Sequence, residues 1–243
     1  MSTPAAVPRL HTDHITVSPW WTTVDEFSIS HLHPDSRPNI AALDQATRHA
    51  SDSGLPSISV SRSFGKFLAL QCKASRAKHM LEVGTLGGYS SIWFATENPD
   101  LKVTTVEYSP KHAAVARESH KSAGVDDRIT VLEGAGVDVL PTVLADVQAG
   151  KKEKIGFAFI DADKPNNYTY FDYAVQMAGK GAIIVVDNAI AKGHVSHERS
   201  DIQFVEEAKK VIENVGKDKR VDATVMQTVD EDGYDGFIYA IVL

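Results

Sequence analysis

The sequence has a single cysteine, Cys72, among its 243 residues. One cysteine excludes a disulfide within the chain and fits a reducing compartment. The residues around it, Phe67, Leu68, Leu70 and Ala74, are apolar. The prediction for Cys72 is therefore a small residue of the hydrophobic core.

Long apolar runs are also missing, since none reaches the ~20 residues that a membrane-spanning helix needs. Residues 1–10 contain two prolines and no apolar core of the kind that a secretory signal has. We therefore expect a cytoplasmic protein with no membrane partner.

The sequence has no long basic run, and its formal net charge is −7. Affinity for nucleic acids comes mostly from Lys and Arg on phosphates, so no nucleic-acid partner is expected. The hydrophobic share of 43% and the charged share of 23% are ordinary for a folded domain.

The length suits one α/β domain, which we place at residues 38–243. Residues 1–37 are rich in Pro, His, Thr and Ser, and we expect an irregular arm there with at most a short helix near 22–28. The pair Trp20-Trp21 is costly to leave in water, so the arm should pack on the body or on a second subunit.

From Lys78 onward the pattern alternates between strands and helices. The strands Phe157–Ile160 and 182–186 are almost entirely apolar, as expected of parallel strands that helices cover on both faces. The last two strands flank a polar turn and are expected to pair antiparallel at the edge of the sheet. Strands are predicted at 80–83, 102–107, 129–133, 155–161, 182–187, 222–229 and 236–242. Helices are predicted at 38–50, 63–75, 90–97, 110–123, 137–149, 166–177 and 201–215.

A glycine-rich loop, Gly84-x-x-Gly87-Gly88, follows the first strand and precedes a helix. Glycines there let the backbone approach a ligand closely, and the helix start offers free N–H groups. The spacing departs from the dinucleotide pattern G-x-G-x-x-G, and Glu82 would repel a pyrophosphate. An acid suits a ligand with an ammonium or sulfonium, which favours S-adenosylmethionine over NAD.

Glu107 ends the second strand, where a carboxylate matches the two hydroxyl donors of a ribose. After the third strand, Gly134-Ala135 would leave room for a flat adenine ring. The glycine loop, the acid and these small residues together predict a nucleoside site.

Acidic and amide side chains follow the fourth and fifth strands, in Asp161-Ala-Asp163-Lys164 and Asp187-Asn188. Ligands of open α/β sheets bind at the carboxyl ends of the strands. Oxygen donors favour Mg²⁺, with Mn²⁺ or Ca²⁺ as alternatives, over metals that prefer thiolates. Asp161, Asp187 and Asn188 are therefore the predicted metal ligands.

These segments resemble the cation-dependent O-methyltransferases, the family of catechol and caffeoyl-CoA O-methyltransferases. The resemblance covers about residues 55–243. It rests on Leu81-Glu-Val-Gly-Thr-Leu-Gly-Gly-Tyr-Ser90, Thr105-Val-Glu-Tyr108, Phe159-Ile-Asp-Ala-Asp-Lys-Pro-Asn-Asn167 and Val185-Val-Asp-Asn188.

The resemblance implies a doubly wound, seven-stranded, mostly parallel sheet with an antiparallel last strand and helices on both faces. It implies a homodimer and a small phenolic substrate. Its metal ligands match Asp161, Asp187 and Asn188, and its proposed general base matches Lys164. Its cofactor contacts match Val60, Glu82, Gly84, Gly88, Tyr89, Ser90, Glu107, Ala135 and Asp161.

Two positions depart from relatives of this kind. Gly136 stands where some have a serine near the adenine, and Asp163 stands where the animal catechol enzymes have a tryptophan that gates the substrate. These departures affect the substrate rather than the reaction.

The expected reaction is in-line transfer of the sulfonium methyl group to one hydroxyl of a catechol-like diol. Lys164 would take the proton of that hydroxyl. Two alternatives remain at this point, an NAD(P)-dependent oxidoreductase on a related fold and a non-catalytic S-adenosylmethionine-binding protein.

Overall fold

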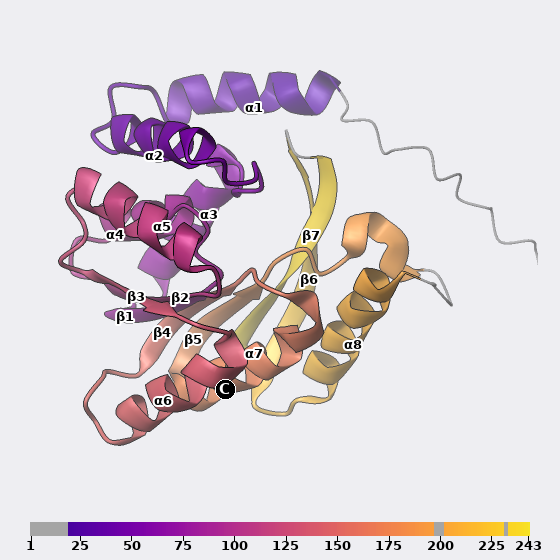
Figure 1. Ribbon diagram of the computed structural model, residues 1–243. Coiled ribbons are helices and arrows are strands. Elements are labelled where there is room, and N and C mark those ends of the chain that lie inside the picture. The colour runs from indigo at the N-terminus through magenta and orange to yellow at the C-terminus, as the bar shows by residue number, and fades with distance from the viewer. Residues whose placement is uncertain (1–18, 197–201, 231–232) are drawn as a thin grey trace, which may run out of the picture.

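A seven-stranded sheet forms the centre of the protein, in the order β3-β2-β1-β4-β5-β7-β6 (Figure 1). The computed structural model describes residues 19–196, 202–230 and 233–243. The strands are β1 His79–Val83, β2 Lys102–Glu107, β3 Ile129–Glu133, β4 Ile155–Ile160, β5 Ala178–Val186, β6 Val221–Asp230 and β7 Gly233–Val242. The helices are α1 Pro19–Leu32, α2 Ile40–Asp52, α3 Arg62–Ala74, α4 Tyr89–Glu97, α5 Pro110–Ser122, α6 Gly136–Gln148, α7 Asn167–Met177 and α8 Gln203–Lys217, with short 3₁₀ turns at η1 Lys164–Asn166 and η2 Ala191–Ser196.

The strands β1 to β5 pair in parallel, and β7 pairs antiparallel with both β5 and β6. This confirms the predicted doubly wound sheet with an antiparallel last strand. The strands β5, β6 and β7 are longer than predicted, because β5 begins at Ala178 and the pairing of β6 with β7 extends to Asp230 and Gly233. Asp201, the first residue predicted for the last helix, lies outside the described residues.

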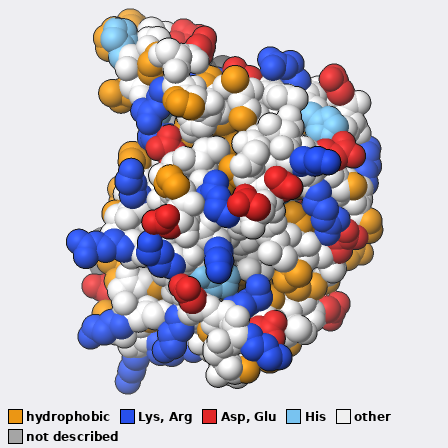
Figure 2. All heavy atoms as spheres, turned by 90° about the vertical axis from the view of Figure 1, so that its left-hand side faces the viewer, with side chains coloured by type: hydrophobic (Ala, Val, Ile, Leu, Met, Phe, Trp, Pro, Cys, Tyr) orange, Lys and Arg blue, Asp and Glu red, His pale blue; other side chains and the backbone are white. Residues whose placement is uncertain are grey.

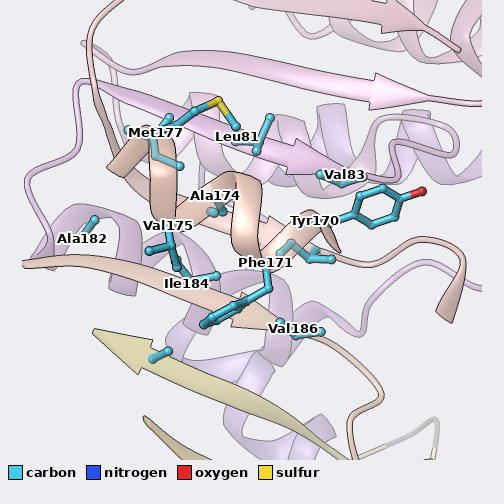
Figure 3. Close-up of a cluster of buried hydrophobic side chains, with 14 of the residues drawn as sticks. Leu81, Val83, Tyr170, Phe171, Ala174, Val175, Met177, Ala182, Ile184 and Val186 are labelled. Carbon is cyan, nitrogen blue, oxygen red and sulfur yellow. The ribbon is translucent and has the colours of Figure 1, made fainter. Parts of the chain in front are cut away.

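Alternate residues of the central strands divide the hydrophobic core into two clusters, one on each face of the sheet. Ile184 and Val186 of β5 pack with α6, α7 and α8, and part of this cluster is shown in Figure 3. Ile183 and Val185 pack in the other cluster, with α2, α3 and α4. This period-two division is why the strands are apolar on both faces.

The N-terminal region differs from the predicted irregular arm where it is described, because Pro19–Leu32 is a helix of 14 residues. It has no internal Gly or Pro, and its only proline occupies the first position, where the ring suits a helix start. The sequence analysis expected the tryptophan pair to pack on the body or on a second subunit. Trp20 is 78% exposed, so this ring does not pack on the body of the protein. Residues 1–18 lie outside the description, and both the 37/38 boundary and the homodimer remain predictions.

Within the described ranges, no helix combines the length and apolar character needed to cross a membrane. Basic and acidic side chains are interspersed on the face shown in Figure 2. The absence of a nucleic-acid partner remains a prediction.

Candidate functional site

A cavity of about 910 Å³ lies at the carboxyl ends of β1, β2, β4 and β5. The segment 57–61, the start of α6 and the tips of β6 and β7 form the rest of its wall. It brings together most of the predicted site residues: Val60, Gly84, Tyr89, Ser90, Glu107, Ala135, Asp161, Lys164, Asp187 and Asn188. Glu82 and Gly88 are not on its wall.

Close packing explains both loop glycines. Gly84 has φ +96°, and a Cβ there would lie 2.0 Å from the carbonyl oxygen of Asp161. Gly88 has φ +86° at the start of α4, and a Cβ there would lie 2.5 Å from Nε2 of His120. Only glycine adopts such angles freely, so Gly84 joins β1 to the end of β4 and Gly88 lets α5 approach the loop.

Glu82 lies beneath the loop and is fully buried. Its carboxylate accepts hydrogen bonds from Ser90 Oγ, Ser91 Oγ and Thr105 Oγ1, each at 2.6 Å. Burial raises its pKa to about 6, although the three hydroxyl donors oppose the shift. These contacts fix the loop and the start of α4, and a direct contact between Glu82 and a ligand stays a prediction.

Glu107 reaches the cavity with its carboxylate already oriented by the backbone. Its Oε2 accepts from the N–H groups of Thr85 at 3.0 Å and Leu86 at 2.9 Å. Its Oε1 accepts from the N–H of Ser109 at 2.9 Å and lies 3.5 Å from Nδ1 of His112, which the sequence analysis missed. The glycine loop therefore holds the predicted ribose acid in place.

At the other end of the cavity, Lys164 extends its amine between polar oxygens. Its Nζ lies 3.1 Å from Oδ1 of Asp161 and 2.8 Å from Oδ1 of Asn188. Asp161 and Asp187 directly follow the parallel strands β4 and β5. The N–H of Asp187 donates to the carbonyl of Ile160 at 2.9 Å, which holds the ends of the two strands together beside Lys164. The predicted juxtaposition of the two strand ends is thus present.

Asp187 is buried beside Asp161. Its pKa is raised well above its usual range, mainly by burial and secondly by the charge of Asp161. Lys164 opposes this shift. Over the described ranges, no group of three or more His, Cys, Asp or Glu side chains could hold a metal ion. The predicted ligands are instead two carboxylates and one amide, and a positive amine already lies among their oxygens.

Asp235 is a further carboxylate on the cavity wall that the sequence analysis assigned only to a polar turn. Its oxygens accept from the N–H of Gly236 at 2.8 Å and from the N–H of Lys192 at 3.3 Å. Burial raises its pKa. It reaches the site because β7 pairs with β5, a pairing that places the tip of β7 beside Asp187.

Ser61 connects α3 to the tip of the hairpin that β6 and β7 form. The Ser61 hydroxyl donates to Oδ2 of Asp230 at 2.8 Å and accepts from the N–H of Phe64 at 3.2 Å. Ser61 is therefore both the N-cap of α3 and a link between two walls of the cavity.

Comparisons with known proteins agree with this geometry. The sequence model of a family described as O-methyltransferase matches residues 31–234. The O-methyltransferase imqG of Aspergillus flavus is 48% identical, with 92% of each chain covered. A catechol O-methyltransferase of Mycobacterium tuberculosis is 44% identical, over 90% of this chain and 94% of that protein. The crystal structure of the O-methyltransferase from Bacillus cereus in complex with SAH has a TM-score of 0.84 and 37% identity, covering 92% of this chain and 99% of that one.

Proposed function

Because the chain belongs to the O-methyltransferase family and is an S-adenosylmethionine-dependent O-methyltransferase, we propose that its acceptor is a small catechol-like or other vicinal-diol phenol and that it requires a divalent cation, with Mg²⁺ the first choice. The observation that carries the proposal is the position of the Lys164 amine. It occupies a cluster of oxygens from Asp161 and Asn188, beside the buried Asp187, in the same cavity as Glu107.

The side chains fit a divalent cation. The Lys164 ammonium shows that the oxygens of Asp161 and Asn188 stabilise positive charge, and Asp187 adds a second carboxylate. Such all-oxygen donors suit Mg²⁺ or Ca²⁺. When bound, the ion would lower the pKa of a coordinated hydroxyl group.

The chain's own residues would align and deprotonate the acceptor. Lys164 Nζ, as the uncharged amine, would take the proton of the reacting hydroxyl and become an ammonium, and the phenolate oxygen would then bond to the methyl carbon as the carbon–sulfur bond breaks. Asp235 offers a carboxylate oxygen on the same wall to the second hydroxyl. Glu107 would hold the ribose, which fixes the methyl donor relative to the acceptor.

The test is methyl transfer from S-adenosylmethionine to a panel of catechols and caffeoyl compounds, with Mg²⁺ and then with EDTA. We expect activity that EDTA abolishes and Mg²⁺ restores. Activity that survives EDTA would contradict the requirement for a divalent cation. Activity only on phenols with a single hydroxyl would contradict the proposed diol acceptor.

The role of Lys164 is tested separately by Lys164→Ala. Loss of the proton acceptor should lower turnover by about 100-fold or more, since general-base catalysis commonly contributes that much. The Mg²⁺ concentration for half-maximal activity should change much less. Unchanged turnover would exclude Lys164 as the base.

A further inference from the structure

The segment that follows β5 has an unusual backbone. In the described part of the chain five non-glycine residues have a positive φ, and three of them lie in the segment 188–192: Asn188 at +54°, Ala191 at +47° and Lys192 at +54°. Residues other than glycine rarely adopt such angles, which persist only where the surrounding structure holds them. Because such residues cluster at functional sites, the side chains that this turn presents to the cavity are of interest.

Contacts on two sides hold the turn in place. Ala191 is buried and packs with Val205 and Ala208 of α8. Toward the hairpin, the N–H of Lys192 donates to Oδ2 of Asp235 at 3.3 Å. The backbone of Lys192 is therefore fixed between α8 and the start of β7, and Lys192 lines the cavity.

Lys192 differs from the other charged residues at this end of the cavity in the partners of its charge. Within the described part of the chain, its Nζ has no hydrogen bond and no ion pair. By contrast, Nζ of Lys164 binds oxygens of Asp161 and Asn188, and the Asp235 carboxylate accepts from two backbone N–H groups. Lys192 thus has a positive charge that can pair with a ligand.

This charge belongs to the acceptor end of the cavity. Lys192 follows the proposed metal ligand Asn188 by four positions in the sequence. Its N–H binds Asp235, the carboxylate that we propose faces the second hydroxyl of the acceptor. We therefore expect an acceptor whose hydroxyls lie among these groups to bring its other substituents within reach of the long Lys192 side chain.

We propose that Lys192 is a specificity-determining residue, whose ammonium pairs with a carboxylate carried by the acceptor. The inference rests on the proposed function and narrows it, since it names the charge class of the acceptor as a phenolic diol with an acidic substituent. A neutral diol would leave the ammonium without this partner, and a cationic diol would be repelled by it.

Three catechols that differ only in the end group of their side chain test the inference: 3,4-dihydroxyphenylacetate, its neutral amide and the cationic 3,4-dihydroxyphenethylamine. Methyl transfer from S-adenosylmethionine is measured for each at saturating Mg²⁺. For the wild-type protein, kcat/KM should be at least about fivefold higher for the acid than for the amide, because an ion pair partly shielded from water is stronger than one in open solvent. The amine should be the poorest of the three.

Substitutions of Lys192 separate its charge from its place in the turn. Lys192→Gln keeps an unbranched side chain and removes the charge, so it should reduce the preference for the acid over the amide to less than about twofold. This change should come from a higher KM for the acid, with kinetics on the amide nearly unchanged. Lys192→Glu should reverse the order and favour the amine, and Lys192→Arg should keep the wild-type preference.

Lys180→Glu is the matched control. Lys180 is an exposed residue of β5 near the amino end of the strand, away from the cavity. This substitution changes the net charge by the same amount as Lys192→Glu, so it measures the effect of overall charge on the three acceptors. It should keep the wild-type preference.

Equal kcat/KM of the wild-type protein for the acid and the amide would overturn the inference. An unchanged preference in Lys192→Gln and Lys192→Glu would overturn it too, as would an equal loss of activity on all three catechols, which would show that Lys192 only maintains the turn. Each of these results leaves the proposed function intact, because the neutral amide is still methylated by the wild-type protein. If that protein methylated none of the three, the proposed diol acceptor would fail, and the inference with it.

Discussion

The two ends of the cavity differ in how their charges are satisfied. At the nucleoside end, Glu107 on the wall and Glu82 beneath the glycine loop each accept three hydrogen bonds from hydroxyl or backbone N–H groups. At the acceptor end, Asp161 and Asp187 lie close together, and the pKa of Asp187 is raised by burial and by its neighbour. The carboxylates at the first end have hydrogen-bond donors from the protein itself, whereas burial and the charge of Asp161 disfavour the charged form of Asp187 at the second end, and a cation there would stabilise it.

This difference separates stability from activity. Carboxylates with a full set of donors stabilise the fold, and removing one leaves buried donors unpaired. A buried carboxylate held beside another carboxylate adds little to stability, so its removal should affect function. Substitutions at the two ends should therefore give opposite results.

The largest effect is expected from Asp187→Asn at the acceptor end. Loss of this charge should lower kcat/KM by about 100-fold or more, as losses of electrostatic stabilisation in active sites commonly do. The free energy of unfolding should change by less than about 1 kcal/mol, and the affinity for S-adenosylhomocysteine should be retained. Asp222→Asn, at an exposed position of β6, is the control. A strongly destabilised Asp187→Asn protein would show that Asp187 stabilises the fold, which contradicts the proposed difference between the two ends of the cavity.

At the nucleoside end, Glu82→Ala should chiefly destabilise the fold. It leaves three hydroxyl groups, two of them buried, without this acceptor, and we expect a loss of about 3 kcal/mol, measured by urea unfolding. Glu133→Ala removes a half-exposed acid paired with Arg117 and should cost less than about 1 kcal/mol. Equal losses in the two variants would show that the hydroxyl contacts do not stabilise the loop.

A smaller effect at the nucleoside end is pH-dependent and comes from His120, packed against Gly88. Burial lowers the pKa of His120 to about 4. The unfolded chain therefore binds a proton near pH 6.5 that the folded protein does not, and stability falls as the pH drops from about 6.5 toward 4. Between pH 7 and pH 5 this contribution is about 2 kcal/mol.

The measurement for His120 is urea unfolding at both pH values. His120→Gln should lose about 2 kcal/mol less than the wild-type protein over this interval. If the two proteins lost the same amount, His120 would not be the group responsible.

The smallest effect is expected at Ser61, which lies between the two ends. Ser61→Ala removes the cap of α3 and should cost about 1 kcal/mol of unfolding free energy. Asp230→Asn keeps the cap and changes only the link to the hairpin. A loss as large in Asp230→Asn as in Ser61→Ala would show that the link, rather than the cap, carries the stability.

The order of strands and helices followed from sequence because long apolar strands alternate with well-capped helices. The sequence also predicted that Glu107, Asp161, Asp187 and Asn188 would lie at one edge of the sheet, since each ends a parallel strand or follows within two residues of its end, and all four line the cavity. Asp235 was not predicted as a site residue. Its position depends on contacts between distant elements, such as the pairing of β5 with β7, which no local pattern records.

The place of β7 in the sheet has a consequence for biosynthesis. This strand lies between β5 and β6, although it follows both of them in the sequence. Until it emerges, β6 has no neighbour to join, and the wall that carries Asp235 is missing. Since chains are made from the N-terminus onward, the nascent protein cannot complete its cavity before β7 has been made. Ligand capture must therefore follow the synthesis of β7.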